Sequence, residues 1–78
     1  MAIPVSRVLE KLDGYLNKKD FAAAERHLSY WLSDAEAEND RRGMLTILNE
    51  QIGFYRKQQR EAESLAASDR AIALAEEL

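Results

Sequence analysis

One histidine and a set of scattered carboxylates are the residues of this chain that could support chemistry. His27 is the only histidine, cysteine is absent, and Gly14, Gly43 and Gly53 stand alone. A di-iron carboxylate bundle needs a glutamate three residues before a histidine, and Ala24 occupies that position. Zinc sites need more ligands than one histidine, and phosphate loops need clustered glycines. We therefore expect no metal site, no cofactor and no enzyme activity.

The remaining charged residues have simpler explanations than catalysis. Acidic neighbours such as Glu76 and Glu77 are typical of a solvated helix face. Arg56, Lys57 and Arg60 gather where a helix is expected to end, and cations there interact favourably with the helix dipole. A basic spot that meets an acidic group of a bound peptide is the functional alternative.

The overall composition indicates a small soluble domain. The chain has 78 residues, of which 46% are hydrophobic and 32% charged, with a net charge of -3 and a pI near 5.1. A nucleic-acid-binding protein usually carries a basic excess, so this class is excluded. No segment approaches the roughly 20 apolar residues of a membrane span, and no signal peptide is evident. The absence of cysteine fits a cytoplasmic location.

Hydrophobic periodicity defines the elements that carry these residues. Apolar side chains recur at spacings of three and four, which predicts helices, while glycine and proline are sparse. Asp20, Asn39 and Asp40 are suitable cap residues at the expected boundaries. The predicted helices cover residues 4–18, 21–38, 41–58 and 61–78.

Two of these helices carry patterns that predict their packing. The third has two apolar stripes, one with Leu48 and Ile52 and the other with Ile47 and Phe54, so we place it between two neighbours. Trp31 is expected to join the core. The fourth helix is expected to pack through a face of mostly small residues, namely Ala62, Leu65, Ala66, Ile72, Ala73 and Ala75.

Side-chain character repeats along the chain at an offset of forty residues. Tyr15 corresponds to Tyr55 in this way, and Leu32 corresponds to Ile72. Repeats of 20 to 50 residues are typical of helical solenoids.

The second half of the chain resembles a tetratricopeptide repeat (TPR). The segment 48–56 is similar to the first helix of the longer-period repeats found in kinesin light chains and bacterial repeat proteins, with Asn49, Tyr55 and Arg56 matching. In the first half, Tyr15 and Phe21 fit the same pattern. The resemblance has departures, because the glycine expected in each turn between helices is replaced, and the replaced positions are Lys19 and Gln59.

This resemblance implies an all-α fold of two tandem antiparallel helix-turn-helix hairpins, residues 4–38 and 41–78, within a single domain covering 1–78. It also implies a non-catalytic scaffold that binds a protein or peptide in a concave groove lined by the first helix of each hairpin. Such a groove uses an asparagine to bond the backbone of the bound peptide, because buried backbone groups need partners. The expected binding residues are Asn49, Gly53, Arg56 and Lys57 from the second hairpin and Leu9, Asp13, Leu16 and Asn17 from the first.

Several alternatives stand beside this prediction. The helices could form a plain four-helix bundle, and Asn49 could bond a neighbouring helix for structural reasons. The chain could instead be a structural module that self-associates into a homo-oligomer through the fourth helix and its open end. Two repeats make a short array, so we also expect an N-terminal fragment of a longer one. Asp13 and Glu50 would repel a carboxylate, so binding of a peptide's C-terminus is not predicted.

Overall fold

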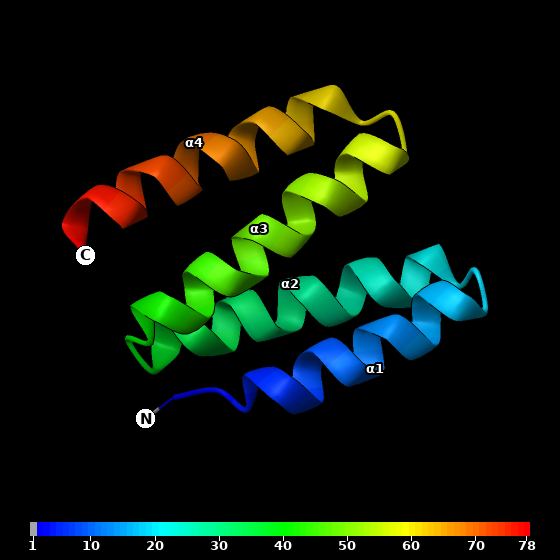
Figure 1. Cartoon of the computed structure of the whole chain (residues 1–78), viewed down its shortest axis with the longest axis horizontal. Coiled ribbons are helices and arrows are strands. Elements are labelled where there is room, and N and C mark those ends of the chain that lie inside the picture. Colours follow the sequence, from blue (N-terminus) through cyan, green and yellow to red (C-terminus); the bar gives the residue numbers. More distant parts are fainter. Residues whose placement is uncertain (1) are drawn as a thin grey trace.

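Four α-helices account for almost all of the computed structural model, which describes residues 2–78 (Figure 1). They are α1 (Val5–Asn17), α2 (Phe21–Ala37), α3 (Arg41–Lys57) and α4 (Glu61–Glu77). No strand occurs among the described residues. The predicted all-α hairpin fold is therefore confirmed, and the helix ends differ from the expected ones by about one residue.

The three turns between helices share one backbone geometry, repeated every twenty residues. Lys19, Asn39 and Gln59 all have a left-handed conformation, with φ values of 58°, 55° and 60°. The residue after each one donates its backbone N–H back into the preceding helix, as Asp20 does to the Tyr15 carbonyl at 2.9 Å. This pattern is the Schellman motif, which satisfies carbonyls that a helix end would leave free. Each helix is therefore followed by a tight reversal into the next.

The helices pack in chain order and do not close into a bundle. Extensive contacts join α1 to α2, α2 to α3, and α3 to α4, and Figure 1 shows α1 and α4 at opposite edges of the molecule. The Cα atoms span 34 × 26 × 15 Å. In a closed four-helix bundle the first and last helices would be neighbours. The arrangement is thus an open array, with α3 between α2 and α4 as its two apolar stripes predict.

The hydrophobic core runs through the interfaces between consecutive helices. Its most deeply buried large side chains come from α1, α2 and α3 and are Val8, Leu12, Leu28, Ile47 and Leu48. Trp31 is half-buried and packs against this cluster, in the core role expected for it.

The prediction of which face of α4 packs against the rest of the molecule is wrong. The buried residues of α4 are Ser64, Ala67, Ala71 and Leu74. By contrast, Leu65 is 65% exposed and Ile72 is 57% exposed. Residues three and four apart share a helix face, and α4 has two faces that follow this spacing. The face that contacts α3 carries Ser64, Ala67 and Ala71, with Leu74 as its one large side chain.

Asp40 joins the start of the chain to the start of α3. Its carboxylate accepts the backbone N–H of Gly43 at 3.0 Å, which caps the helix, and the backbone N–H of Ile3 at 2.8 Å. Ile3 is thereby held in the core, where it is 5% exposed. This bond holds the segment before α1 against the start of α3. Half of the predicted site residues lie on α1.

No helix within residues 2–78 combines the length and the apolar character that crossing a bilayer requires.

Candidate functional site

A groove of about 360 Å³ lies between α1 and α3, above the start of α2. We call it the α1–α3 groove. Its lining residues come from the C-terminal half of α1, the first residue of α2, and the second half of α3 with the turn that follows it. They are Leu12, Leu16, Phe21, Asn49, Glu50, Gly53, Phe54, Lys57 and Gln58. Ligand sites in proteins usually occupy about 300–1,000 Å³, so this groove has room for a small number of side chains.

Apolar side chains line one part of the groove. Leu12 and Phe54 are buried and belong to the hydrophobic core, and Leu16 packs partly buried against that core. Phe21 is 41% exposed, so part of its ring is in contact with water. An apolar side chain placed here would lose contact with water on several sides and would cover the exposed ring.

Polar groups without partners line the rest of the groove. Asn49, Glu50 and Lys57 are all exposed. None of the three makes a side-chain hydrogen bond or an ion pair with another residue in the described part of the chain. The alternative that Asn49 bonds a neighbouring helix therefore finds no support. These groups can donate to and accept from a ligand without breaking a contact of the fold.

Gly53 adds open space at the centre of the α3 segment that lines the groove. A Cβ atom built at this position would have no neighbour within 4 Å. Glycine disfavours a helix interior by about 1 kcal/mol relative to alanine, so its place in α3 costs some stability. The open space above the backbone is where a ligand could approach α3 closely.

Half of the residues predicted from the sequence are brought together in this groove. Leu16, Asn49, Gly53 and Lys57 line it. The other four lie outside the lining: Leu9 is half-buried against the core, and Asp13, Asn17 and Arg56 are exposed.

The sequence reasoning missed the aromatic part of the groove. Phe54 was assigned to a stripe that packs on a neighbouring helix, and it is indeed 8% exposed while still reaching the groove. Phe21 fits the repeat pattern in the first half of the chain, but that pattern does not predict it to line the groove. A signal for Phe21 existed in its position directly after a cap residue, since the first residue of α2 is close to the last turn of α1.

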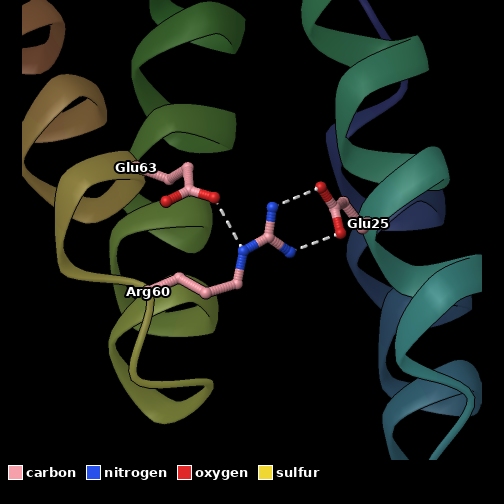
Figure 2. Close-up of polar contacts among 3 residues, drawn as sticks. All are labelled: Glu25, Arg60 and Glu63. Carbon is pink, nitrogen blue, oxygen red and sulfur yellow. Dashed lines mark hydrogen bonds and ion pairs between the residues drawn. The ribbon is translucent and has the colours of Figure 1, made fainter.

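Arg60 forms the most connected polar cluster of the molecule, away from the α1–α3 groove (Figure 2). It lies in the turn between α3 and α4, and its guanidinium donates to both carboxylate oxygens of Glu25 on α2, at 2.6 and 3.0 Å. Its Nε donates to Glu63 on α4 at 2.8 Å, and its Cζ lies 4.8 Å from the centre of the Tyr55 ring. We call this group the Arg60 clamp, because it ties the second hairpin to α2.

The charges of the Arg60 clamp shift the titration of its members. Hydrogen bonds from Arg60 lower the pKa of both Glu25 and Glu63 below the ordinary glutamate value. Burial, together with the nearby Glu25 charge, raises the pKa of the Tyr55 hydroxyl. All of these groups have a structural partner that explains their state. The charge of Arg60 is therefore already paired within the protein, so Arg60 does not form a free basic spot with Arg56 and Lys57.

His27 also has a structural role. Its Nε2 donates to the backbone carbonyl of Val8 at 2.8 Å, joining α2 to α1. The ring makes edge contacts with Tyr15, at a centroid distance of 5.4 Å, and with Trp31, at 6.5 Å. No group of three or more potential metal ligands occurs among the described residues.

Comparison of the chain with models of protein families, with curated proteins and with solved structures finds no match.

Proposed function

We propose that this chain is a non-catalytic protein-interaction module that binds a peptide segment of a partner protein in the α1–α3 groove. The observation that carries the proposal is the presence of unpartnered amide and charged side chains beside an exposed phenylalanine in one groove. Such a combination of apolar surface and a few placed polar groups is characteristic of binding sites.

The groove chemistry defines the kind of peptide. An apolar or aromatic side chain of the peptide would enter above Gly53 and cover Phe21, which removes apolar surface of both partners from water. The Asn49 amide can both donate to and accept from a peptide group, so it suits an extended backbone whose own N–H and C=O are unpaired. Glu50 directly follows Asn49, and Lys57 stands about two turns further along α3. Each would favour an opposite charge on the peptide residue that it meets.

The proposal is supported by the similarity of the second hairpin to tetratricopeptide repeats, whose first helices line a peptide-binding groove. The groove lined by α1 and α3 corresponds to that position. The cytoplasmic location and the longer parent array stay predictions from the sequence.

Selection of peptides on the immobilised chain, followed by blocking of the groove, tests the proposal. A Gly53→Leu variant places a side chain into the groove and meets no neighbour at its Cβ. Gly14→Leu is the matched control, because Gly14 is also helical and also open at its Cβ but lies outside the groove. Both changes replace a poor helix former with a good one.

We expect peptides enriched from a random displayed library to bind the wild type and Gly14→Leu equally. We expect Gly53→Leu to weaken their binding at least about tenfold, the effect of losing one buried apolar side chain. If no peptide is enriched, or if enriched peptides bind both variants alike, the α1–α3 groove is not the binding site.

A further inference from the structure

The outer face of α4 leaves large apolar side chains in water, at the edge of the array opposite to α1 (Figure 1). Leu65 is 65% exposed and Ile72 is 57% exposed. They are seven residues apart, so they lie along one side of the helix, with Ser68 and Ala75 in the same rows. We call this surface, defined by Leu65, Ser68, Ile72 and Ala75, the open α4 face.

The open α4 face corresponds to a face of α2 that is covered. Forty residues earlier, Leu28, Leu32 and Ala35 occupy the positions of Ser68, Ile72 and Ala75, and they are 1%, 8% and 0% exposed. The difference has a simple cause, because α2 packs against helices on both sides, α1 and α3, whereas α4 packs against α3. Three of the four positions of the open α4 face therefore match positions that are covered in α2, and the fourth, Leu65, corresponds to the partly exposed Glu25.

The net charge changes sign from α2 to α3 and again from α3 to α4, whereas α1 carries two basic and two acidic residues. Acidic α2 carries three acidic residues and one basic, α3 carries four basic and one acidic, and α4 carries five acidic and one basic. One ion pair follows this alternation, between Arg41 of α3 and Glu77 of α4 at 3.1 Å. A second pair, between Arg70 and Glu36, joins the two acidic helices α4 and α2. A helix that continued the pattern beyond α4 would be basic.

The acids beside the open α4 face have no cation of their own. Glu61, Asp69 and Glu76 lie four residues from Leu65 or Ile72, which places them next to these side chains. None of the three forms an ion pair within the described residues. The single cation of α4, Arg70, is paired with Glu36 at 2.8 Å. Glu76 also stands in the last turn, where the helix dipole disfavours a negative charge.

We propose that the open α4 face is a docking site for an amphipathic helix of a partner protein whose apolar stripe is flanked by lysine and arginine. The apolar stripe would cover Leu65 and Ile72, and the basic residues would meet Glu61, Asp69 and Glu76. This site is separate from the α1–α3 groove and does not depend on it. A second copy of the chain fits less well, because two open α4 faces would bring like charges together.

The test uses the full chain and two fluorescently labelled helical peptides of the length of α4. One peptide has a leucine stripe flanked by lysines, and the other has glutamate in place of each lysine. The variant Leu65→Lys/Ile72→Lys removes both apolar contacts. Tyr30→Lys/Ala37→Lys is the matched control, because it adds the same charge at exposed positions of α2. All four substituted residues are exposed, so both variants keep the core intact.

We expect the basic peptide to bind the wild type with an affinity at least about tenfold higher than that of the acidic peptide. Leu65→Lys/Ile72→Lys should weaken the basic peptide by at least about tenfold more than the control does, because apolar contact is lost at equal added charge. If both variants weakened the binding of the basic peptide equally, the binding would be non-specific charge attraction and the proposal would be overturned. The absence of binding would also overturn it, as would a homodimer that only the α4 variant dissociates, which would assign the face to a second copy.

Discussion

The three glycines of the chain all lie within helices, but Gly43 has close neighbours where Gly14 and Gly53 have none. An added Cβ at Gly14 or Gly53 would meet no atom within 4 Å. At Gly43 it would collide with the Asp40 carboxylate that caps α3, and it would come within 2.9 Å of Ile3 Cγ1. Gly43 is therefore required by local packing, whereas the other two positions tolerate a side chain.

Alanine substitutions at two of these glycines should change stability in opposite directions. We expect Gly14→Ala to raise the free energy of unfolding by about 0.5–1 kcal/mol through helix propensity. We expect Gly43→Ala to lower it by about 1–3 kcal/mol, because the cap and the Ile3 contact must both shift. Urea denaturation followed by circular dichroism measures both. Equal stabilisation by the two variants would contradict the close contact at Gly43.

At the residue scale the sequence predicted the polar part of the groove better than the apolar part. The resemblance to tetratricopeptide repeats predicts Asn49 and Lys57 in the groove, and both line it. Phe21 and Phe54 are apolar at helical spacing, and that pattern is equally typical of core residues. Which side of such a ring stays open depends on how α1 lies against α3, and no local pattern specifies that placement.

At the scale of the elements, the turns show how a repeated geometry can be hidden in dissimilar sequences. Asn39 predicted its turn because asparagine tolerates the left-handed region. Lys19 and Gln59 adopt the same conformation without belonging to a favoured residue type. The Schellman hydrogen bonds and the packing of the flanking helices over-determine these positions, so the turn forms despite the local strain.

Relief of this strain is measurable in the first turn. Lys19 has φ 58°, and Lys18, its neighbour, has φ -87°. We expect Lys19→Gly to stabilise the protein by up to about 1 kcal/mol, since glycine adopts positive φ freely. Lys18→Gly removes the same charge, but Lys18 has a negative φ and gains nothing from glycine. We expect this variant to lower the free energy of unfolding by about 0.5–1 kcal/mol, because glycine gives the unfolded chain more conformational entropy to lose on folding. A thermal melt in which the two variants changed stability equally would contradict this account.

The Arg60 clamp should make stability depend on pH in the acidic range. The folded-state pKa values of Glu25 and Glu63 are lowered, so their contribution is complete above the ordinary glutamate pKa of about 4.3. It is lost as the pH falls through the folded-state values, because the unfolded chain takes up the protons first.

The variant Glu25→Gln isolates this contribution. We expect it to melt at a lower temperature than the wild type at pH 7, with the gap closing below about pH 4 and shrinking in high salt. Glu10→Gln is the control, because Glu10 is exposed on α1 and forms no ion pair in the described part of the chain. A gap that stayed constant down to low pH would mean that the bond between Arg60 and Glu25 does not stabilise the fold.

At the scale of the whole molecule, the open order of the helices determines which surfaces are available. The forty-residue offset predicted two similar hairpins, and the two stripes of α3 predicted its central position. The orientation of α4 was not predictable in the same way, because both of its faces satisfy helical spacing. Ser64, Ala67 and Ala71 allow α4 to approach α3 closely with Leu74 beside them, and the face that carries Leu65 and Ile72 is left outside.

The most direct test of the proposed binding is to map the amide chemical shifts of the labelled chain during titration with one selected peptide. We expect the largest changes in the second halves of α1 and α3 and at Phe21, and we expect Gly53→Leu to abolish them. The proposed binding would be contradicted if the largest changes fell on the outer side of α2 or on the open α4 face, with the amides around Asn49 and Gly53 unchanged.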